Sequence, residues 1–136
     1  MRRFLLITLI LGAMVMIAAA LASFAPAAPP GKDIAVVDIP DKTRLLKAEL
    51  QGKYIFVHDD EKMAAGEPYF YVYRYSQDKS GQPEVRPENL VVAFHCQPVQ
   101  REKRSLLYLT CVMTGDGAFE LREIQFAGSL EGHRVP

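Results

Sequence analysis

The chain has 136 residues with 16 basic and 16 acidic side chains, and its formal net charge at pH 7 is zero. A protein without a surplus of Lys and Arg does not displace the counterions of a phosphate backbone, so we expect no nucleic-acid binding. Because 49% of the residues are hydrophobic, a wholly disordered chain is not expected either, and the length suits a single domain.

Residues 1–22 have the order of a secretory signal peptide: a positive start, a long apolar stretch, and small residues that end at Ala22. We expect an N-terminal signal helix that is cleaved after Ala22, and therefore a periplasmic or secreted protein. The alternative is an uncleaved segment that anchors the chain to the inner membrane, since about 20 apolar residues span a bilayer. Residues 23–32 are rich in Pro and Ala and predict an extended leader, which leaves 33–136 as one β domain.

Alternating apolar and polar residues dominate the chain from about Ile34 onward. This pattern predicts an all-β fold, an antiparallel β-sandwich or small barrel of about seven strands. The expected strands are 33–39, 43–50, 53–58, 69–75, 90–97, 105–113 and 118–126. We also expect one helical turn within 59–67 and a polar loop over 76–89.

Turn residues predict three hairpins. Gln51-Gly52 is typical of a two-residue turn, and the Gly-rich segment 114–117 is a second turn. The charged run 100–104 predicts the third, in a register that sets Cys96 opposite Cys111 on an apolar face. Because an exported protein meets an oxidising compartment, we expect a Cys96–Cys111 disulfide, with two buried reduced thiols as the alternative.

The last predicted strand breaks its own alternation. Phe119 and Leu121 have one parity, whereas Ile124 and Phe126 have the other. One extra residue near Arg122-Glu123 would bring all four side chains to the core, which predicts a β-bulge.

Three histidines and two neighbouring carboxylates are candidate ligands for Zn or Cu: His58, His95, His133, Asp59 and Asp60. Their spacing matches no local metal motif, so a site would depend on the tertiary fold. The alternative is three histidines that are satisfied by backbone or carboxylate partners.

Four tyrosines alternate along one predicted strand and share a face: Tyr69, Tyr71, Tyr73 and Tyr75. Such a row can bind a saccharide or an envelope partner, because each ring has an apolar body and a polar tip. It can equally be a half-buried sheet face beneath a loop.

The chain has no G-x-S-x-G, H-E-x-x-H, Walker, C-x-x-C or G-x-G-x-x-G motif, so we lean against an enzyme. We expect a non-enzymatic binding or structural module of the cell envelope. The first alternative is a metal-binding periplasmic protein that uses the three histidines. The second is a hydrolase-like enzyme with a His58/Asp60 site assembled by the fold.

The chain resembles an uncharacterised group of small exported bacterial proteins. The resemblance lies in three segments, GKYIFVHD (52–59), FHCQP (94–98) and QFAGSLEGH (125–133), each of which contains one of the histidines. It implies a periplasmic or secreted β domain and carries over no catalytic residue. Where such relatives carry Cys in the Gly66-Glu67-Pro68-Tyr69 region, this chain has Tyr69.

Overall fold

The computed structural model describes residues 31–136, which form one compact unit, Gly31–Pro136. The predicted signal peptide and most of the predicted leader lie outside the described residues, so cleavage after Ala22 stays a prediction. Within the described part of the chain, no helix has both the length and the apolar character needed to cross a membrane.

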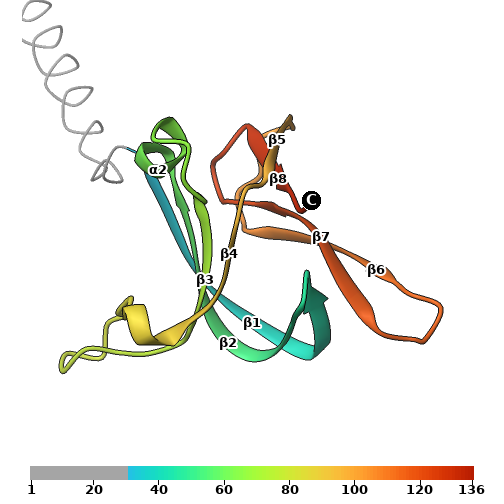
Figure 1. Ribbon diagram of the computed structural model, residues 1–136, viewed down its shortest axis with the longest axis horizontal. Helices are drawn as coiled ribbons and strands as arrows, with labels where there is room; N and C mark the ends of the chain where they lie inside the picture. The colour runs from blue at the N-terminus through green and yellow to red at the C-terminus, as the bar shows by residue number, and fades with distance from the viewer. Residues whose placement is uncertain (1–30) are drawn as a thin grey trace, which may run out of the picture. The chain divides into compact units, whose positions relative to one another are not determined.

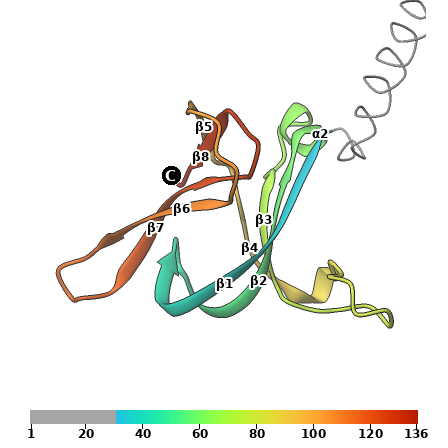
Figure 2. The ribbon, with the colours of Figure 1, turned by 180° about the vertical axis from the view of Figure 1, so that it is seen from behind.

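Eight strands form one sheet that curls into a half-barrel (Figures 1 and 2), in the order β4-β3-β2-β1-β7-β8-β5, with β6 paired to β7. The strands are β1 (Lys32–Leu45), β2 (Ala48–Asp59), β3 (Phe70–Arg74), β4 (Leu90–Phe94), β5 (Gln97–Gln100), β6 (Tyr108–Met113), β7 (Phe119–Gln125) and β8 (Glu131–Arg134). Two short helical turns are α2 (Asp60–Ala64) and η2 (Pro87–Asn89).

The mostly β fold is confirmed; where the sequence predicted an antiparallel sandwich or a small barrel, the structure has one curled sheet. One sheet encloses the core because β1 and β2, with 14 and 12 residues, are long enough to bend around it. The sheet is also mixed, since β1 and β7 run parallel where Thr43 pairs with Phe119. All other strand pairs are antiparallel among the described residues.

The first hairpin turns at a different place from the one predicted. β1 and β2 pair on both sides of Gln51-Gly52, and the turn lies at Leu46-Lys47. Leu46 has a φ of 56°, a left-handed conformation that a leucine rarely adopts. Gly52, at a φ of 95°, lies inside β2 beside the bulge between Ile39 and Thr43. The glycine therefore marks the bend of a long strand.

The second hairpin and the predicted bulge are confirmed. Residues 114–117 join β6 to β7, and the pairing register shifts opposite Arg122, which has no partner in β6. Leu121 and Ile124 differ in parity along the chain, yet both lie in the core, at 1% and 0% exposure. One extra residue thus brings both side chains to the same face.

The third predicted hairpin is wrong. The chain leaves β4 at Phe94, passes through His95-Cys96, and enters β5, which pairs with β8 and not with β6. Cys96 therefore does not lie opposite Cys111, and both cysteines are free. The partner of β5 comes from the last described strand, which no local turn residue indicates.

An ion pair between Arg101 and Glu123 links the segment that follows β5 to β7. Arg101 donates from Nε and Nη2 to the two carboxylate oxygens of Glu123, each at 2.7 Å. These hydrogen bonds hold the pKa of Glu123 below its usual value of 4.5. A carboxylate whose pKa falls on folding stabilises the protein above its unfolded-state pKa, and this stabilisation is lost as the pH falls through the folded-state pKa.

We therefore expect Glu123→Gln to lower the melting temperature at about pH 7, and this deficit to shrink toward zero as the pH approaches about 2. Calorimetry of both proteins across this range measures the difference. Glu120→Gln is the control, because Glu120 pairs with Arg122 at 3.2 Å between more exposed side chains. A deficit that keeps its full size in acid would contradict the assignment.

Candidate metal centre

Three buried side chains from distant parts of the chain come together in the fold. His58 lies on β2, Cys96 in the short segment between β4 and β5, and His133 on β8. One nitrogen of each imidazole and the sulfur all lie within 4.8 Å of one another. We call these three residues the His–Cys–His cluster.

The cluster is tightly packed and its hydrogen bonding is incomplete. Cys96 Sγ lies 3.5 Å from His133 Nδ1, and the imidazoles of His58 and His133 stack with centroids 4.1 Å apart. The two histidine side chains are only 4% and 2% exposed. Neither Nε2 atom has a hydrogen-bond partner among the described residues. Buried polar atoms without a partner are rare in native proteins, so two together indicate a missing partner.

Burial controls the protonation of the cluster. Desolvation, together with the nearby His58, lowers the pKa of His133 to about 4. Desolvation also raises the pKa of the Cys96 thiol to about 11. At neutral pH and without metal, His133 is therefore a neutral imidazole, and Cys96 keeps its proton. The imidazole can accept a metal ion directly, whereas the thiol must lose its proton on binding.

Two carboxylates lie at the edge of the cluster. Glu131 Oε1 is 3.7 Å from His133 Nδ1, and Asp60 Oδ1 is 3.5 Å from His58 Nδ1. Both acidic side chains reach solvent, at 44% and 64% exposure. Carboxylates in such positions can bind a metal ion or orient the imidazoles that do.

Asp59, another predicted ligand, uses both of its carboxylate oxygens in contacts outside the cluster. Its Oδ1 accepts hydrogen bonds from the backbone N–H groups of Glu61 and Lys62, which caps α2 and confirms the predicted helical turn. Its Oδ2 pairs with Lys32 at 3.3 Å. Both oxygens therefore have partners away from the cluster.

His95 lies outside the cluster. Its side chain is exposed, and its ring packs edge-on against Tyr69 with centroids 5.7 Å apart. Its neighbour Cys96 takes the place in the cluster that the sequence assigned to His95. The sequence placed Cys96 on an apolar face, but the expected disulfide hid its availability as a ligand.

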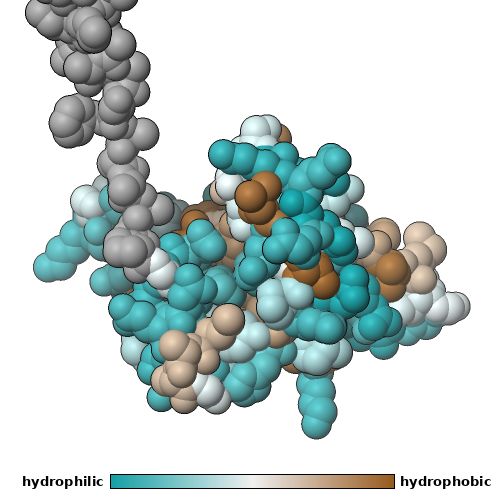
Figure 3. Space-filling view, turned by 90° about the horizontal axis from the view of Figure 1, so that it is seen from above, coloured by the Kyte–Doolittle hydropathy of each residue, from teal (hydrophilic) through white to brown (hydrophobic). Residues whose placement is uncertain are grey.

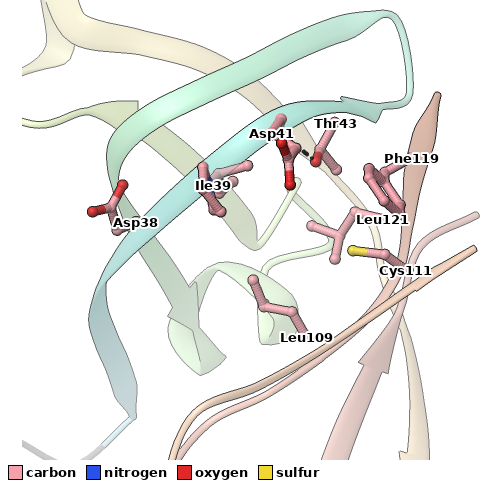
Figure 4. A pocket seen from close by; sticks show the side chains of 9 residues that line it. Asp38, Ile39, Asp41, Thr43, Leu109, Cys111, Phe119 and Leu121 are labelled. Atoms are coloured by element: carbon pink, nitrogen blue, oxygen red, sulfur yellow. Dashed lines mark hydrogen bonds between the residues drawn. The ribbon is translucent and has the colours of Figure 1, made fainter.

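Cys111 lines a separate pocket of about 220 Å³ between β1 and the β6–β7 hairpin. Figure 4 shows its sulfur directed into the pocket with Leu109 and Leu121, and the walls are mainly apolar. Burial raises the pKa of this thiol. A raised pKa leaves less of the nucleophilic thiolate at neutral pH.

The four tyrosines have different surroundings. Tyr69 is buried, and its hydroxyl donates to the backbone carbonyl of Cys96. Tyr71 and Tyr73 are half-buried and stack with centroids 6.2 Å apart, and Tyr75 is half-buried as well. Figure 3 shows one face of the molecule, where hydrophilic side chains surround small hydrophobic patches. A saccharide or partner surface on these tyrosines stays a prediction.

The resemblance to small exported β proteins assigns no activity to the chain. Comparison with protein-family models, with curated proteins and with solved structures found no match. The proposal below therefore rests on the geometry of the His–Cys–His cluster.

Proposed function

We propose that the protein binds one transition-metal ion, Zn²⁺ or copper, through His58, Cys96 and His133, and that it does so as an exported protein of the cell envelope. Imidazole nitrogen and thiolate sulfur are ligands that suit both metals. The convergence of three buried ligand side chains, whose donor atoms lie within 4.8 Å of one another, carries the proposal.

One donor distance in the cluster supports this assignment. A tetrahedral zinc ion with Zn–S of about 2.3 Å and Zn–N of about 2.0–2.1 Å holds its sulfur and nitrogen ligands about 3.5 Å apart. Cys96 Sγ and His133 Nδ1 are 3.5 Å apart. A hydrogen bond between thiol and imidazole accounts for the same distance, so the decisive measurement is metal affinity.

The burial of His58 argues against the hydrolase alternative. A general base must reach its substrate within hydrogen-bond distance. The His58 side chain is 4% exposed and stacks on His133, so a substrate in solution has no access to it. A buried ion with protein ligands needs no such access.

We expect the purified protein to bind one equivalent of Zn²⁺ or Cu⁺, measured by elemental analysis and by competition with a chromophoric chelator. His133→Ala and Cys96→Ser each remove a ligand and are expected to weaken binding by about 100-fold or more. This is at or above the upper end of the range of about 10–100-fold that is typical of losing a group that only orients a ligand.

The chain provides a matched control for each variant. His95→Ala removes the exposed neighbouring histidine, and Cys111→Ser removes the cysteine outside the cluster; both are expected to keep wild-type affinity. Far-UV circular dichroism verifies that every variant is folded. Absence of binding by the wild type, or equal losses in the control variants, would show that the cluster is a hydrogen-bonded part of the core.

A further inference from the structure

A carboxylate and a thiol approach the same imidazole nitrogen. Glu131 and His133 are two residues apart on β8, so their side chains leave the strand on the same side. Glu131 Oε1 lies 3.7 Å from His133 Nδ1, and Cys96 Sγ lies 3.5 Å from it. An ion bound between this nitrogen and the sulfur would therefore have a carboxylate beside it.

Building on the proposed function, we propose that Glu131 is the fourth ligand of the ion and that it selects Zn²⁺ over Cu⁺. Three protein ligands leave a tetrahedral ion one open position. Oxygen and nitrogen ligands on one zinc ion lie about 3.4 Å apart, from bond lengths of about 2.0–2.2 Å. The observed 3.7 Å between Glu131 Oε1 and His133 Nδ1 is close to this value.

Charge balance explains why this carboxylate discriminates between the two ions. Zn²⁺ bound by two neutral imidazoles and the Cys96 thiolate leaves one positive charge in a buried site, which is costly without a second anion. Glu131 supplies that anion. Cu⁺ with the same three ligands is already neutral, and a soft ion gains little from a hard carboxylate oxygen.

Asp60 is the other carboxylate at the cluster, but its position is less suitable. Its side chain is the more exposed of the two, at 64% against 44% for Glu131. It is also the first residue of α2, where the N-terminal end of the helix stabilises a carboxylate in place. Glu131, in contrast, lies on a strand that pairs with both β5 and β7, and its backbone N–H is held by Ser129 Oγ.

Glu131→Gln tests the proposal, with Asp60→Asn as the matched control. Zn²⁺ and Cu⁺ affinities are measured separately by chelator competition, the second under anaerobic conditions. We expect Glu131→Gln to weaken Zn²⁺ binding by about 100-fold, as for loss of the other ligands, and to change Cu⁺ binding by less than threefold. Asp60→Asn removes a carboxylate that faces only His58, so we expect it to weaken Zn²⁺ and Cu⁺ binding by the same factor, and by less than Glu131→Gln weakens Zn²⁺ binding.

The visible spectrum of the Co²⁺-substituted protein gives a second readout. Four-coordinate Co²⁺ absorbs far more strongly than six-coordinate Co²⁺, so we expect strong bands in the wild type and weaker, shifted bands in Glu131→Gln. Unchanged Zn²⁺ affinity in Glu131→Gln, an equal loss for both ions, or a larger loss in Asp60→Asn would overturn the proposal. Wild-type protein that binds neither ion would instead remove the proposed function itself.

Discussion

Replacing Phe70 by alanine is expected to lower the free energy of unfolding by about 3–5 kcal/mol, as is usual for a buried phenylalanine, and to abolish metal binding. Phe70 is fully buried on β3. Its ring contacts aromatic side chains from both halves of the curled sheet. These are Phe56, Phe94, Phe126, His58 and His133, with centroids between 5.0 and 6.3 Å away.

Loss of this ring leaves a cavity beside His58 and His133. Their stacked imidazoles then lose the aromatic side chain that they pack against. Denaturant unfolding measures the stability, and chelator competition measures metal binding in the same samples. Phe119→Ala is the control, because Phe119 is only half-buried, and we expect it to cost less and to leave metal affinity unchanged. A Phe70→Ala protein with wild-type affinity would show that the cluster does not depend on the aromatic core.

Zn²⁺ at about 100 times its dissociation constant is expected to stabilise the protein by about 2.7 kcal/mol, since an ion that binds only the folded state adds RT ln(1 + [L]/Kd). For a domain of this size that corresponds to a rise of about 10–20 °C in melting temperature. Thermal unfolding with Zn²⁺ and with excess chelator measures the shift.

The proposed ligands come from strands that are separated in the sheet. His58 comes from β2, whereas His133 comes from β8, on the other side of β1 and β7 in the sheet. An ion between them joins strands that do not pair with each other. Cys96→Ser is expected to lose most of the shift and Cys111→Ser to keep it. An equal shift in the two variants would place the zinc ion elsewhere on the protein.

Local turn chemistry explains which parts of the fold were predictable. The Gly-rich turn 114–117 and the bulge at Arg122 follow from neighbouring residues, and both were predicted. The turn at Leu46-Lys47 contains neither Gly nor Asn, and Gly52 misled the prediction because a long strand needs a glycine where it bends. The pairing of β5 with β8 depends on distant residues, so no turn residue could indicate it.

The site was half predictable for a similar reason. Residue type identified His58 and His133 as possible ligands, but only the fold brings them to a common point. Cys96 was missed because a hairpin between 90–97 and 105–113 offered it a partner in Cys111. His95 lies outside the cluster, since its neighbour Cys96 faces the core and successive residues of an extended chain point in opposite directions.

The parallel contact between β1 and β7 has a kinetic consequence. Thr43 and Phe119 pair although most of the domain's sequence lies between them. Closing so long a loop costs conformational entropy before the contacts that offset this cost have formed. We expect this closure to be a slow step of folding. Until it is complete, His58 and His133 are apart and both thiols are open to oxidation. In an oxidising compartment, a Cys96–Cys111 bond formed during that interval would trap misfolded molecules, because the native fold keeps the two cysteines apart as free thiols.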